Sequence, residues 1–296
     1  MTSPAARFVT PPPDAGLLRR LLQEQAPELV EAELTQLPGG RDNAAIRVGR
    51  DLVARLPLHS NSAPLMEHEQ RWLPGIAARL PVQTSAPVVA GRPGSGYPHP
   101  WSVAQWIEGG TADRTTYDPA LAAPVLVSLF QALHQPAPPE APANPLRSVP
   151  LSQRLPRFRE HLADLRHPEA ERLAGALTEI AALPEPSGPL TWTHGDLHHR
   201  NVIVDGKAIT GVIDWGDLHA GDAVTDYAAV WMLLPETEHR GVREALGGDD
   251  VTWERARGWA LVFGVLLMVI GNAEADSAFF RAGEITCARA MTSARL

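Results

Sequence analysis

Two runs rich in β-branched residues on either side of an Asp-Gly pair constrain the fold of this chain more than any other segment. The runs are residues 201–204 (NVIV) and 207–213 (KAITGVI), and the pair between them is residues 205–206. This arrangement is typical of a β-hairpin with a two-residue turn. The pairs predicted across the hairpin are Val204 with Lys207, Val202 with Ile209 and Asn201 with Thr210.

The hairpin is expected to bring three polar side chains, Asp196, Asn201 and Asp214, to one end of a small sheet. A carboxylate and a carboxamide are hard oxygen donors that can hold Mg²⁺ and leave positions for phosphate oxygens and water. A second carboxylate can orient and deprotonate an attacking hydroxyl group. We therefore expect Asn201 and Asp214 to bind Mg²⁺ and Asp196 to be the catalytic residue in a phosphoryl transfer from a nucleotide.

Two other interpretations of this segment stay open. In the first, Asp196 and Asp214 only cap turns and strand ends and take no part in chemistry. In the second, the histidines of residues 194–199 (HGDLHH) form the metal site of a hydrolase. The second interpretation leaves Asn201 and Asp214 without a role, and neighbouring residues of an extended loop point in different directions.

The motif HGDLHHRN at residues 194–201, followed by VIDWGD at residues 212–217, resembles the aminoglycoside phosphotransferase family. Members of this family are antibiotic and small-molecule kinases with a protein-kinase-like fold. The first motif is similar to the HRD-xxxx-N catalytic loop of protein kinases, and residues 213–216 stand where their DFG motif is found. Residues 221–228 (GDAVTDYA) are similar to the GDP-xxD-LA stretch that follows in the family.

The resemblance implies an α+β fold of the protein-kinase type with two lobes. We expect a small N-lobe with an antiparallel sheet at residues 1–107, and a larger, mainly helical C-lobe at residues 108–296. The N-lobe is predicted to start with a helix at residues 17–34 that is interrupted near Pro27. The helices predicted for the C-lobe span residues 120–134, 151–183, 223–234, 253–270 and 279–291.

The resemblance also implies that the N-lobe holds the nucleotide. Gly39 and Gly40 lie in a turn between two short strands, where glycines let backbone amides approach phosphate groups. Taken alone, such a pair of glycines is more often a plain turn. Residues 101–107 form a predicted strand similar to the kinase hinge, in which the backbone carbonyl of Gln105 and the amide of Ile107 would contact the base.

A basic residue and an acidic residue of the N-lobe are expected to pair. Glu69 lies among apolar neighbours on one face of a predicted helix that has Ser62 as its N-cap and Pro64 in its first turn. An inward carboxylate needs a partner. In the resembling fold this partner is the basic residue of the third strand, which is usually lysine and is Arg55 here. Arginine can pair with the carboxylate and reach phosphate, whereas in the other interpretation both residues are solvated.

Two further residues, His194 and Asp226, are assigned supporting roles by the resemblance. Asp226 would accept hydrogen bonds beneath the catalytic loop, and His194 would help to hold that loop. The simpler interpretation of Asp226 is a favourable charge at the start of a helix. We therefore expect both residues to support the site without taking part in the reaction.

Composition and charge limit the classes of partner. The 296 residues suffice for two lobes, and 44% hydrophobic with 20% charged residues is usual for a soluble globular enzyme. The single cysteine fits a reducing cytoplasm, and residues 1–16 show no secretory signal. Residues 259–270, the longest apolar run, are fewer than the ~20 that a membrane span requires. A net charge of −8 argues against nucleic acid as a partner and tolerates a cationic substrate.

These observations predict a cytoplasmic, Mg²⁺-dependent kinase for small molecules. It would transfer the γ-phosphoryl group of ATP or GTP to a hydroxyl group of an antibiotic, with an aminoglycoside as the first candidate. A macrolide kinase that uses GTP, and a kinase for a metabolite alcohol, are alternatives with the same fold. A nonenzymatic kinase-like protein that only binds nucleotide is the alternative from another class.

Overall fold

The chain divides into two compact units. The structure is a computed structural model that describes residues 7–38, 40–147, 149–186 and 188–292. Unit 1 comprises Met1–Ala78, Gln83–Ile107 and Asp214–Leu218. Unit 2 comprises Arg79–Val82, Glu108–Ile213 and His219–Leu296. The short segment Asp214–Leu218 thus packs with unit 1, although unit 2 flanks it in the sequence.

Unit 1 is built on an antiparallel sheet with the strand order β1-β2-β3-β6-β5. The strands are β1 (Leu34–Gln36), β2 (Asn43–Val48), β3 (Leu52–Pro57), β5 (Pro87–Gly91) and β6 (Trp101–Gln105). The other elements of the unit are α1 (Ala15–Gln25), η1 (Pro27–Leu29), α2 (Ala63–Ala77), β4 (Gln83–Thr84) and η3 (Trp215–Asp217). The helix predicted at residues 17–34 is wrong beyond Gln25, because Pro27 starts a 3-10 turn and Leu34 begins β1.

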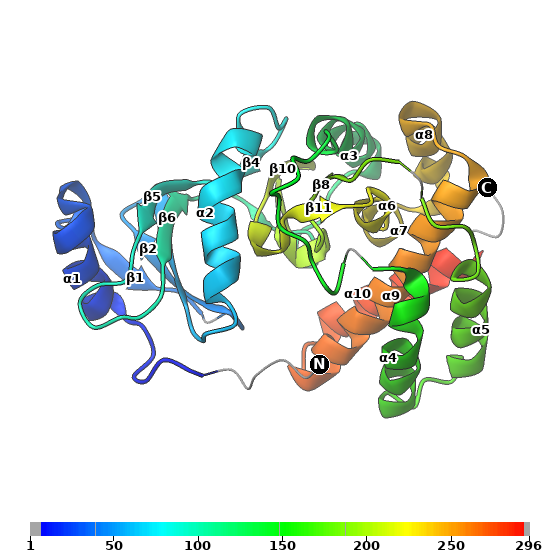
Figure 1. Ribbon diagram of the computed structural model, residues 1–296, viewed down its shortest axis with the longest axis horizontal. Helices are drawn as coiled ribbons and strands as arrows, with labels where there is room; N and C mark the ends of the chain where they lie inside the picture. Colours follow the sequence, from blue (N-terminus) through cyan, green and yellow to red (C-terminus); the bar gives the residue numbers. More distant parts are fainter. Residues whose placement is uncertain (1–6, 39, 148, 187, 293–296) are drawn as a thin grey trace. The chain divides into compact units, whose positions relative to one another are not determined.

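The two faces of this sheet are covered by different helices, α1 and α2 (Figure 1). Successive residues of a strand point to opposite faces. Ala54 and Leu56 of β3 are fully buried in a core that includes Leu18 and Leu21 of α1. Arg55, which lies between them, therefore points to the face on which α2 packs. The alternation of β3 alone thus directs one arginine toward the helix that carries the candidate carboxylate.

Unit 2 is mainly helical. Its helices are α3 (Pro119–Leu133), α4 (Leu151–Asp164), α5 (Ala170–Ile180), α6 (Val224–Tyr227), α7 (Ala229–Leu233), α8 (Glu236–Leu246), α9 (Asp250–Ala273) and α10 (Ser277–Thr292). The helix predicted at residues 151–183 is wrong in its continuity, because Arg166 has φ +50° and Pro168 follows. The helix predicted at residues 223–234 is likewise divided into α6 and α7, and α8 was not predicted.

Helices α9 and α10 pack closely at two glycines. A Cβ atom on Gly283 would lie 2.4 Å from the carbonyl oxygen of Gly264, so the two backbones can approach only without side chains there. By length and composition, α9 could cross a membrane, but 67% of its most apolar window is buried within the protein. A core helix has these properties as well.

Short strands complete unit 2 and carry the motifs. They are β7 (Gly110–Thr111), β8 (Thr191–Thr193), β9 (Val202–Asp205), β10 (Ala208–Val212) and β11 (His219–Gly221). Strand β9 pairs with β10 on one side and with β7 on the other, and β8 pairs with β11. The 3-10 turn η2 (His199–Asn201) is the last part of the HGDLHHRN motif and leads into β9.

Candidate functional site

The predicted hairpin is present as β9 and β10, but its register differs from the prediction. Asp205 pairs with Ala208, so residues 206–207 are the central residues of the turn, and not residues 205–206. Gly206 has φ +62°, a conformation that suits a glycine at the first central position of a two-residue turn. Among residues 205–207 only Gly206 has a positive φ, as in a type II′ turn, whereas a type I′ turn at residues 205–206 would also need a positive φ at Asp205.

A β-bulge in β10 shifts the far end of the hairpin again. The register changes between Ile209 and Gly211, and Val202 pairs with Val212 instead of Ile209. As a result, the amide of Ile213 donates a hydrogen bond of 2.9 Å to the carbonyl oxygen of Asn201. The bulge therefore brings the residue before Asp214 opposite Asn201, which the predicted pairing of Asn201 with Thr210 did not do.

Asp196 is held by charged and polar groups of unit 2. Its Oδ1 lies 2.7 Å from Nη2 of Arg147, and its Oδ2 lies 3.3 Å from Nε2 of His198. Burial by itself would raise the pKa of Asp196, but the attraction of His198 and Arg147 lowers it below its ordinary value. The side chain is 20% exposed. Asp196 is therefore an ionised carboxylate that a ligand can still reach.

Asn201 is oriented by the backbone of the same loop. Its side-chain Nδ2 donates a hydrogen bond of 2.8 Å to the carbonyl oxygen of Asp196, and the side chain is buried. Because the nitrogen donates to Asp196, the amide oxygen is the atom that can bind a cation. The structure thus brings Asp196 and Asn201 together at the start of β9.

Asp226 and His194 support this loop from beneath. The carboxylate of Asp226 accepts hydrogen bonds of 2.8 Å from the amides of both His194 and Gly195, and one of 3.0 Å from Nε2 of His134. Burial would raise the pKa of Asp226, but the hydrogen bond and charge of His134 lower it below its ordinary value. His194 Nε2 is 3.1 Å from the carbonyl oxygen of Ile213, so its ring joins the loop to the end of the hairpin.

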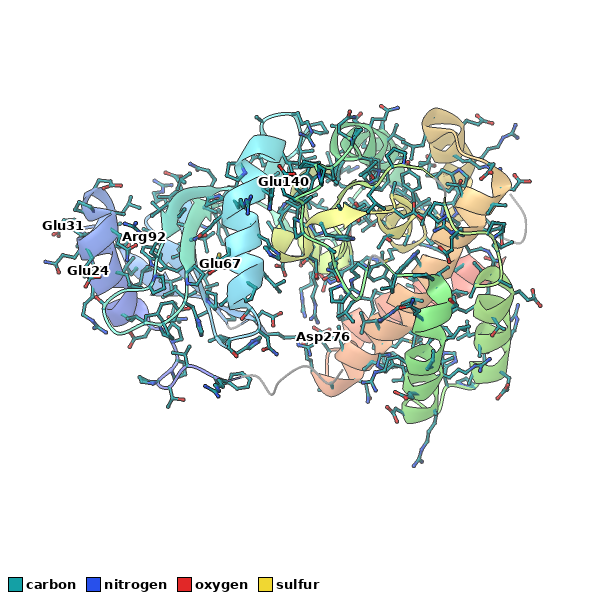
Figure 2. All side chains as sticks on the ribbon, viewed as in Figure 1. Glu24, Glu31, Glu67, Arg92, Glu140 and Asp276 are labelled. Atoms are coloured by element: carbon teal, nitrogen blue, oxygen red, sulfur yellow. The ribbon has the colours of Figure 1, made fainter. Side chains whose placement is uncertain are left out.

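In unit 1, Arg55 and Glu69 form an ion pair. Glu69 is 1% exposed, and burial raises its pKa, an effect that Arg55 opposes and Asp214 increases. Glu67, on the same helix, is exposed (Figure 2). Ser62 is the N-cap as predicted but makes no capping bond, since its hydroxyl donates to the carbonyl oxygen of Asp42.

Asp214 lies in unit 1 and has an unusual backbone conformation. Its φ of +61° and ψ of +64° are left-handed, which is uncommon for a residue other than glycine. Aspartate and asparagine tolerate this region better than most residues. Strained residues of this kind concentrate at functional sites. The conformation is thus compatible with the role predicted for Asp214.

The remaining nucleotide-binding candidates are placed as follows. Gly39 lies outside the described residues, and a Cβ on Gly40 would be 3.1 Å from the carbonyl oxygen of Asn43. Gln105 ends β6 with an exposed side chain, and Ile107 is buried. Between them, the chain is fixed by a hydrogen bond of 2.7 Å from the Trp106 amide to the carbonyl oxygen of Asp51.

Two polar residues of the loop network were not assigned a role from the sequence. Arg147 comes from the proline-rich stretch between α3 and α4, where no motif marks it. His134 is marked in the sequence by its position at the end of a predicted helix and by a Leu-His pair similar to a recurring feature of the resembling family, but neither predicts its partner. Both contacts join residues far apart in the sequence, at separations of 49 for Arg147 with Asp196 and 92 for His134 with Asp226.

Comparisons with known proteins agree with this architecture. Residues 33–259 match the family model described as the phosphotransferase enzyme family. The viomycin phosphotransferase of Streptomyces vinaceus is 38% identical over 123 residues, which are 40% of this chain and 40% of that protein. The alignment therefore covers less than half of that relative.

Two solved structures are similar over almost the whole chain. The GDP complex of wild-type aminoglycoside 2'-phosphotransferase-IIIa is 20% identical, covers 95% of this chain and 99% of its own, and has a TM-score of 0.67. The apoenzyme of the macrolide 2'-phosphotransferase MphH from Brachybacterium faecium is 19% identical, covers 93% and 97%, and has a TM-score of 0.60. These likenesses confirm the α+β, protein-kinase-like fold class.

Proposed function

The chain belongs to the phosphotransferase enzyme family, and we propose that it is a kinase for an antibiotic-like small molecule. It transfers the γ-phosphoryl group of ATP or GTP to a hydroxyl group of the acceptor. The viomycin, aminoglycoside and macrolide phosphotransferases to which it is similar support an antibiotic as the acceptor, with an aminoglycoside as the first candidate. The GDP and ADP complexes among the similar structures support a nucleotide as the donor.

The observation that carries the proposal is the state of Asp196. A residue that orients a hydroxyl group and accepts its proton must be ionised and within reach of solvent. His198 and Arg147 keep this carboxylate ionised, and part of it is exposed. As the acceptor oxygen forms its bond to the γ-phosphorus, the hydroxyl proton passes to Asp196. The bond from that phosphorus to the bridging oxygen breaks, and the nucleoside diphosphate leaves with the electron pair.

Asn201 and Asp214 are the residues that would hold Mg²⁺. Their side chains supply a carboxamide oxygen and a carboxylate, which are the hard oxygen donors that Mg²⁺ prefers. The hydrogen bond from the Ile213 amide to the Asn201 carbonyl supports this assignment, because Asp214 is the next residue of the chain. When bound, the ion neutralises charge on the transferring phosphate.

Unit 1 supplies the residues proposed to hold the nucleotide. Arg55, fixed by its pairing with Glu69, would bind phosphate oxygens, and the glycine turn at Gly39 and Gly40 would cover them. Backbone groups of Gln105 and Ile107 would contact the base. We place the enzyme in the cytoplasm, without a nucleic-acid or membrane partner.

Mass spectrometry of acceptor mixtures tests this proposal. The protein is incubated with Mg²⁺, ATP or GTP, and a panel of aminoglycosides, viomycin, macrolides and amino alcohols. Phosphorylation of a panel member is expected, and Asp196→Ala should slow it by ~10²–10⁴ while nucleotide binding stays within a few-fold. Asp164→Ala is the matched control, because this carboxylate is exposed at the end of α4.

Two results would contradict the proposal in different ways. Turnover by Asp196→Ala close to that of the unmodified protein would remove Asp196 from the mechanism. Nucleotide binding or hydrolysis without any phosphorylated acceptor would instead favour a protein that only binds nucleotide.

A further inference from the structure

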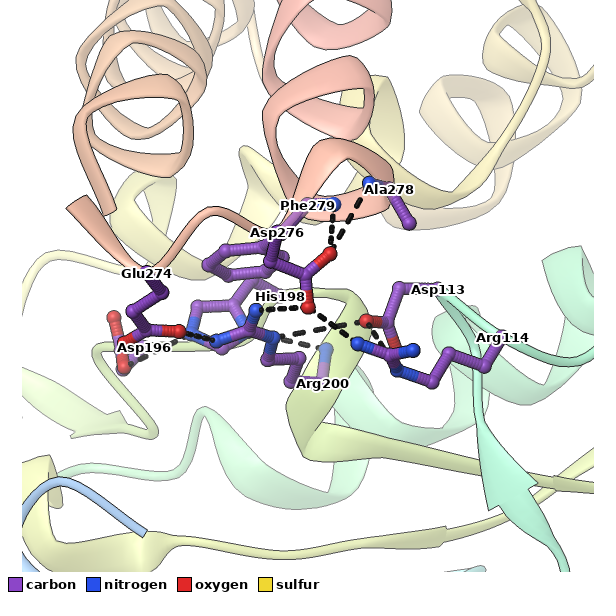
Figure 3. Close-up of polar contacts among 9 residues, drawn as sticks. All are labelled: Asp113, Arg114, Asp196, His198, Arg200, Glu274, Asp276, Ala278 and Phe279. Carbon is purple, nitrogen blue, oxygen red and sulfur yellow. Dashed lines mark hydrogen bonds and ion pairs between the residues drawn. The ribbon is translucent and has the colours of Figure 1, made fainter. Parts of the chain in front are cut away.

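Arg200 occupies the catalytic-loop motif between Asp196 and Asn201 and is bound by carboxylates from a distant part of unit 2 (Figure 3). Its Nη1 lies 2.7 Å from Oε2 of Glu274, and its Nη2 lies 2.9 Å from Oδ2 of Asp276. Both carboxylates belong to the short connection between α9 and α10. The guanidinium group is therefore held between the loop and that connection.

A third carboxylate, that of Asp113 just after β7, adds to this cluster. Nε of Arg200 is 3.6 Å from Oδ2 of Asp113, whose side chain is fully buried. Arg114 also pairs with Asp113 and Asp276, but its side chain is 61% exposed. Exposed ion pairs contribute little, whereas removing one partner of a buried charge leaves the other uncompensated. Nε of Arg114 lies 3.7 Å from the same Asp113 oxygen, almost the distance found for Arg200, but the Arg200 side chain is the less exposed of the two, at 26%.

Arg200 also reaches Asp196 through aromatic rings. Its guanidinium carbon lies 3.6 Å from the centroid of the Phe279 ring. That ring meets His198 edge to face at 5.4 Å, and Nε2 of His198 is 3.3 Å from Oδ2 of Asp196. Phe279 lies in the first turn of α10. Asp276 fixes the start of this helix, since it accepts hydrogen bonds from the amides of Ala278 and Phe279.

We propose that Arg200 is a positioning residue, which holds His198 against Asp196 through Phe279 and fixes the backbone that presents Asn201. This inference rests on the proposed function of the loop. Displacing a reacting group by about 1 Å can cost 10²-fold in rate. Arg200→Met, which keeps much of the apolar stem and loses the charge, is expected to lower kcat ~10–100-fold. The KM for nucleotide should change by less than about threefold, because Arg200 does not act through unit 1.

The experiment compares three variants of the full chain with the unmodified protein. Arg200→Lys supplies the charge without the planar fork and should recover part of kcat. Arg114→Met is the matched control, because it removes a charge from the same carboxylates but lies outside the catalytic loop, and its kcat should be unchanged. A loss of fold stability alone would lower Tm and the folded fraction of a variant, and kcat per folded molecule would then equal that of the unmodified protein.

A spectroscopic signature, measured at one pH without nucleotide, makes the test independent of turnover. The ring protons of His198 lie beside Phe279, so their NMR signals should carry a ring-current shift. The signals are identified by their loss in His198→Asn. They should move or broaden in Arg200→Met and stay in place in Arg114→Met.

The outcomes separate the inference from the function on which it rests. Unchanged His198 signals in Arg200→Met, or an equal response in Arg114→Met, would overturn the positioning role. If Arg200→Met does not fold, Phe279→Leu breaks the ring contact without removing a charge and must lower kcat, because the loss of the ring current alone would already move the His198 signals; an unchanged kcat in Phe279→Leu would overturn the positioning role. Absence of any phosphorylated acceptor with the unmodified protein would count against the proposed function alone, and the NMR comparison would still decide the role of Arg200.

Discussion

Replacing Asp226 with asparagine isolates the contribution of one buried carboxylate to the catalytic loop. The aspartate is 1% exposed and accepts bonds from three donors. The amides of His194 and Gly195 each donate at 2.8 Å, and His134 donates at 3.0 Å. Asparagine has nearly the same shape but only one acceptor oxygen, and its NH₂ group can only donate.

The cost of this change follows from the geometry. The best orientation of asparagine keeps its oxygen on the donors of His194 and His134 and turns its nitrogen toward the Gly195 amide. Two bonds to a charged acceptor then become neutral bonds, at about 1 kcal/mol each, and one buried N–H loses its partner, at ~1–3 kcal/mol. We expect the free energy of unfolding to fall by about 3–5 kcal/mol, and Tm to fall by ~6–20 °C.

Urea unfolding at several pH values is the assay. Because the folded-state pKa of Asp226 lies below its ordinary value, the carboxylate contributes fully above its unfolded pKa of about 3.9. This contribution is lost as the pH falls through that value toward the folded-state pKa. The advantage of the unmodified protein over Asp226→Asn should shrink as the pH falls below about 5.

Asp164→Asn serves as the control for this measurement. Its side chain is exposed, and the change should stay within about 0.5 kcal/mol. A difference below about 1 kcal/mol for Asp226→Asn at pH 7 would refute the reasoning, and so would a difference that grows as the pH falls from 5 toward 3.

Three further predictions concern other parts of the chain. Arg55→Ala and Glu69→Ala should each lower stability, and in urea unfolding the double variant should cost less than their sum by ~0.5–3 kcal/mol; additive effects would show that the pair does not interact. Asp214→Asn should abolish phosphoryl transfer with little change in Tm without nucleotide, because asparagine also tolerates the left-handed conformation; unfolding of the nucleotide-free variant in calorimetry would make Asp214 structural. Gly109 has φ +124°, and a Cβ there would lie 2.3 Å from the carbonyl oxygen of Val204 in β9, so Gly109→Ala should lower Tm. Gly175→Ala is the control, because a Cβ at Gly175 has open space; equal Tm values for the two variants would contradict this prediction.

The sequence predicts the hairpin but not its register. The Asp-Gly signal correctly located a two-residue turn to within one residue, since either pair of central residues would suit the flanking strands. The bulge near Thr210 lies next to Gly211, and an isolated glycine inside a strand pattern is a signal of a bulge that the predicted pairing did not take into account. That bulge, and not the turn, determines which residue lies opposite Asn201.

The residues of the candidate site also fall into those that the sequence predicts and those that it does not. The proximity of Asp196, Asn201 and Asp214 could be predicted from their spacing, because the three residues lie within one motif and its hairpin. The roles of Arg147 and Arg200 could not be predicted from the sequence, because their carboxylate partners are tens of residues away and arginines on loops are usually solvated. Periodicity identified Glu69 as an inward carboxylate, and its burial among apolar residues of α2 agrees with that.

Because Asp214–Leu218 belongs to unit 1, a gene divided after Ile107 separates this segment from the rest of its unit. A fragment that stops at Ile107 would keep every strand of the unit 1 sheet but would lack this segment. Trp215 is fully buried, and Gly216 lies close enough to Leu65 of α2 that a Cβ there would be 3.2 Å from the leucine Cβ. The truncated fragment would therefore expose part of α2 to water. Coexpression of two halves split at this point should yield soluble protein only when the second half supplies the missing segment.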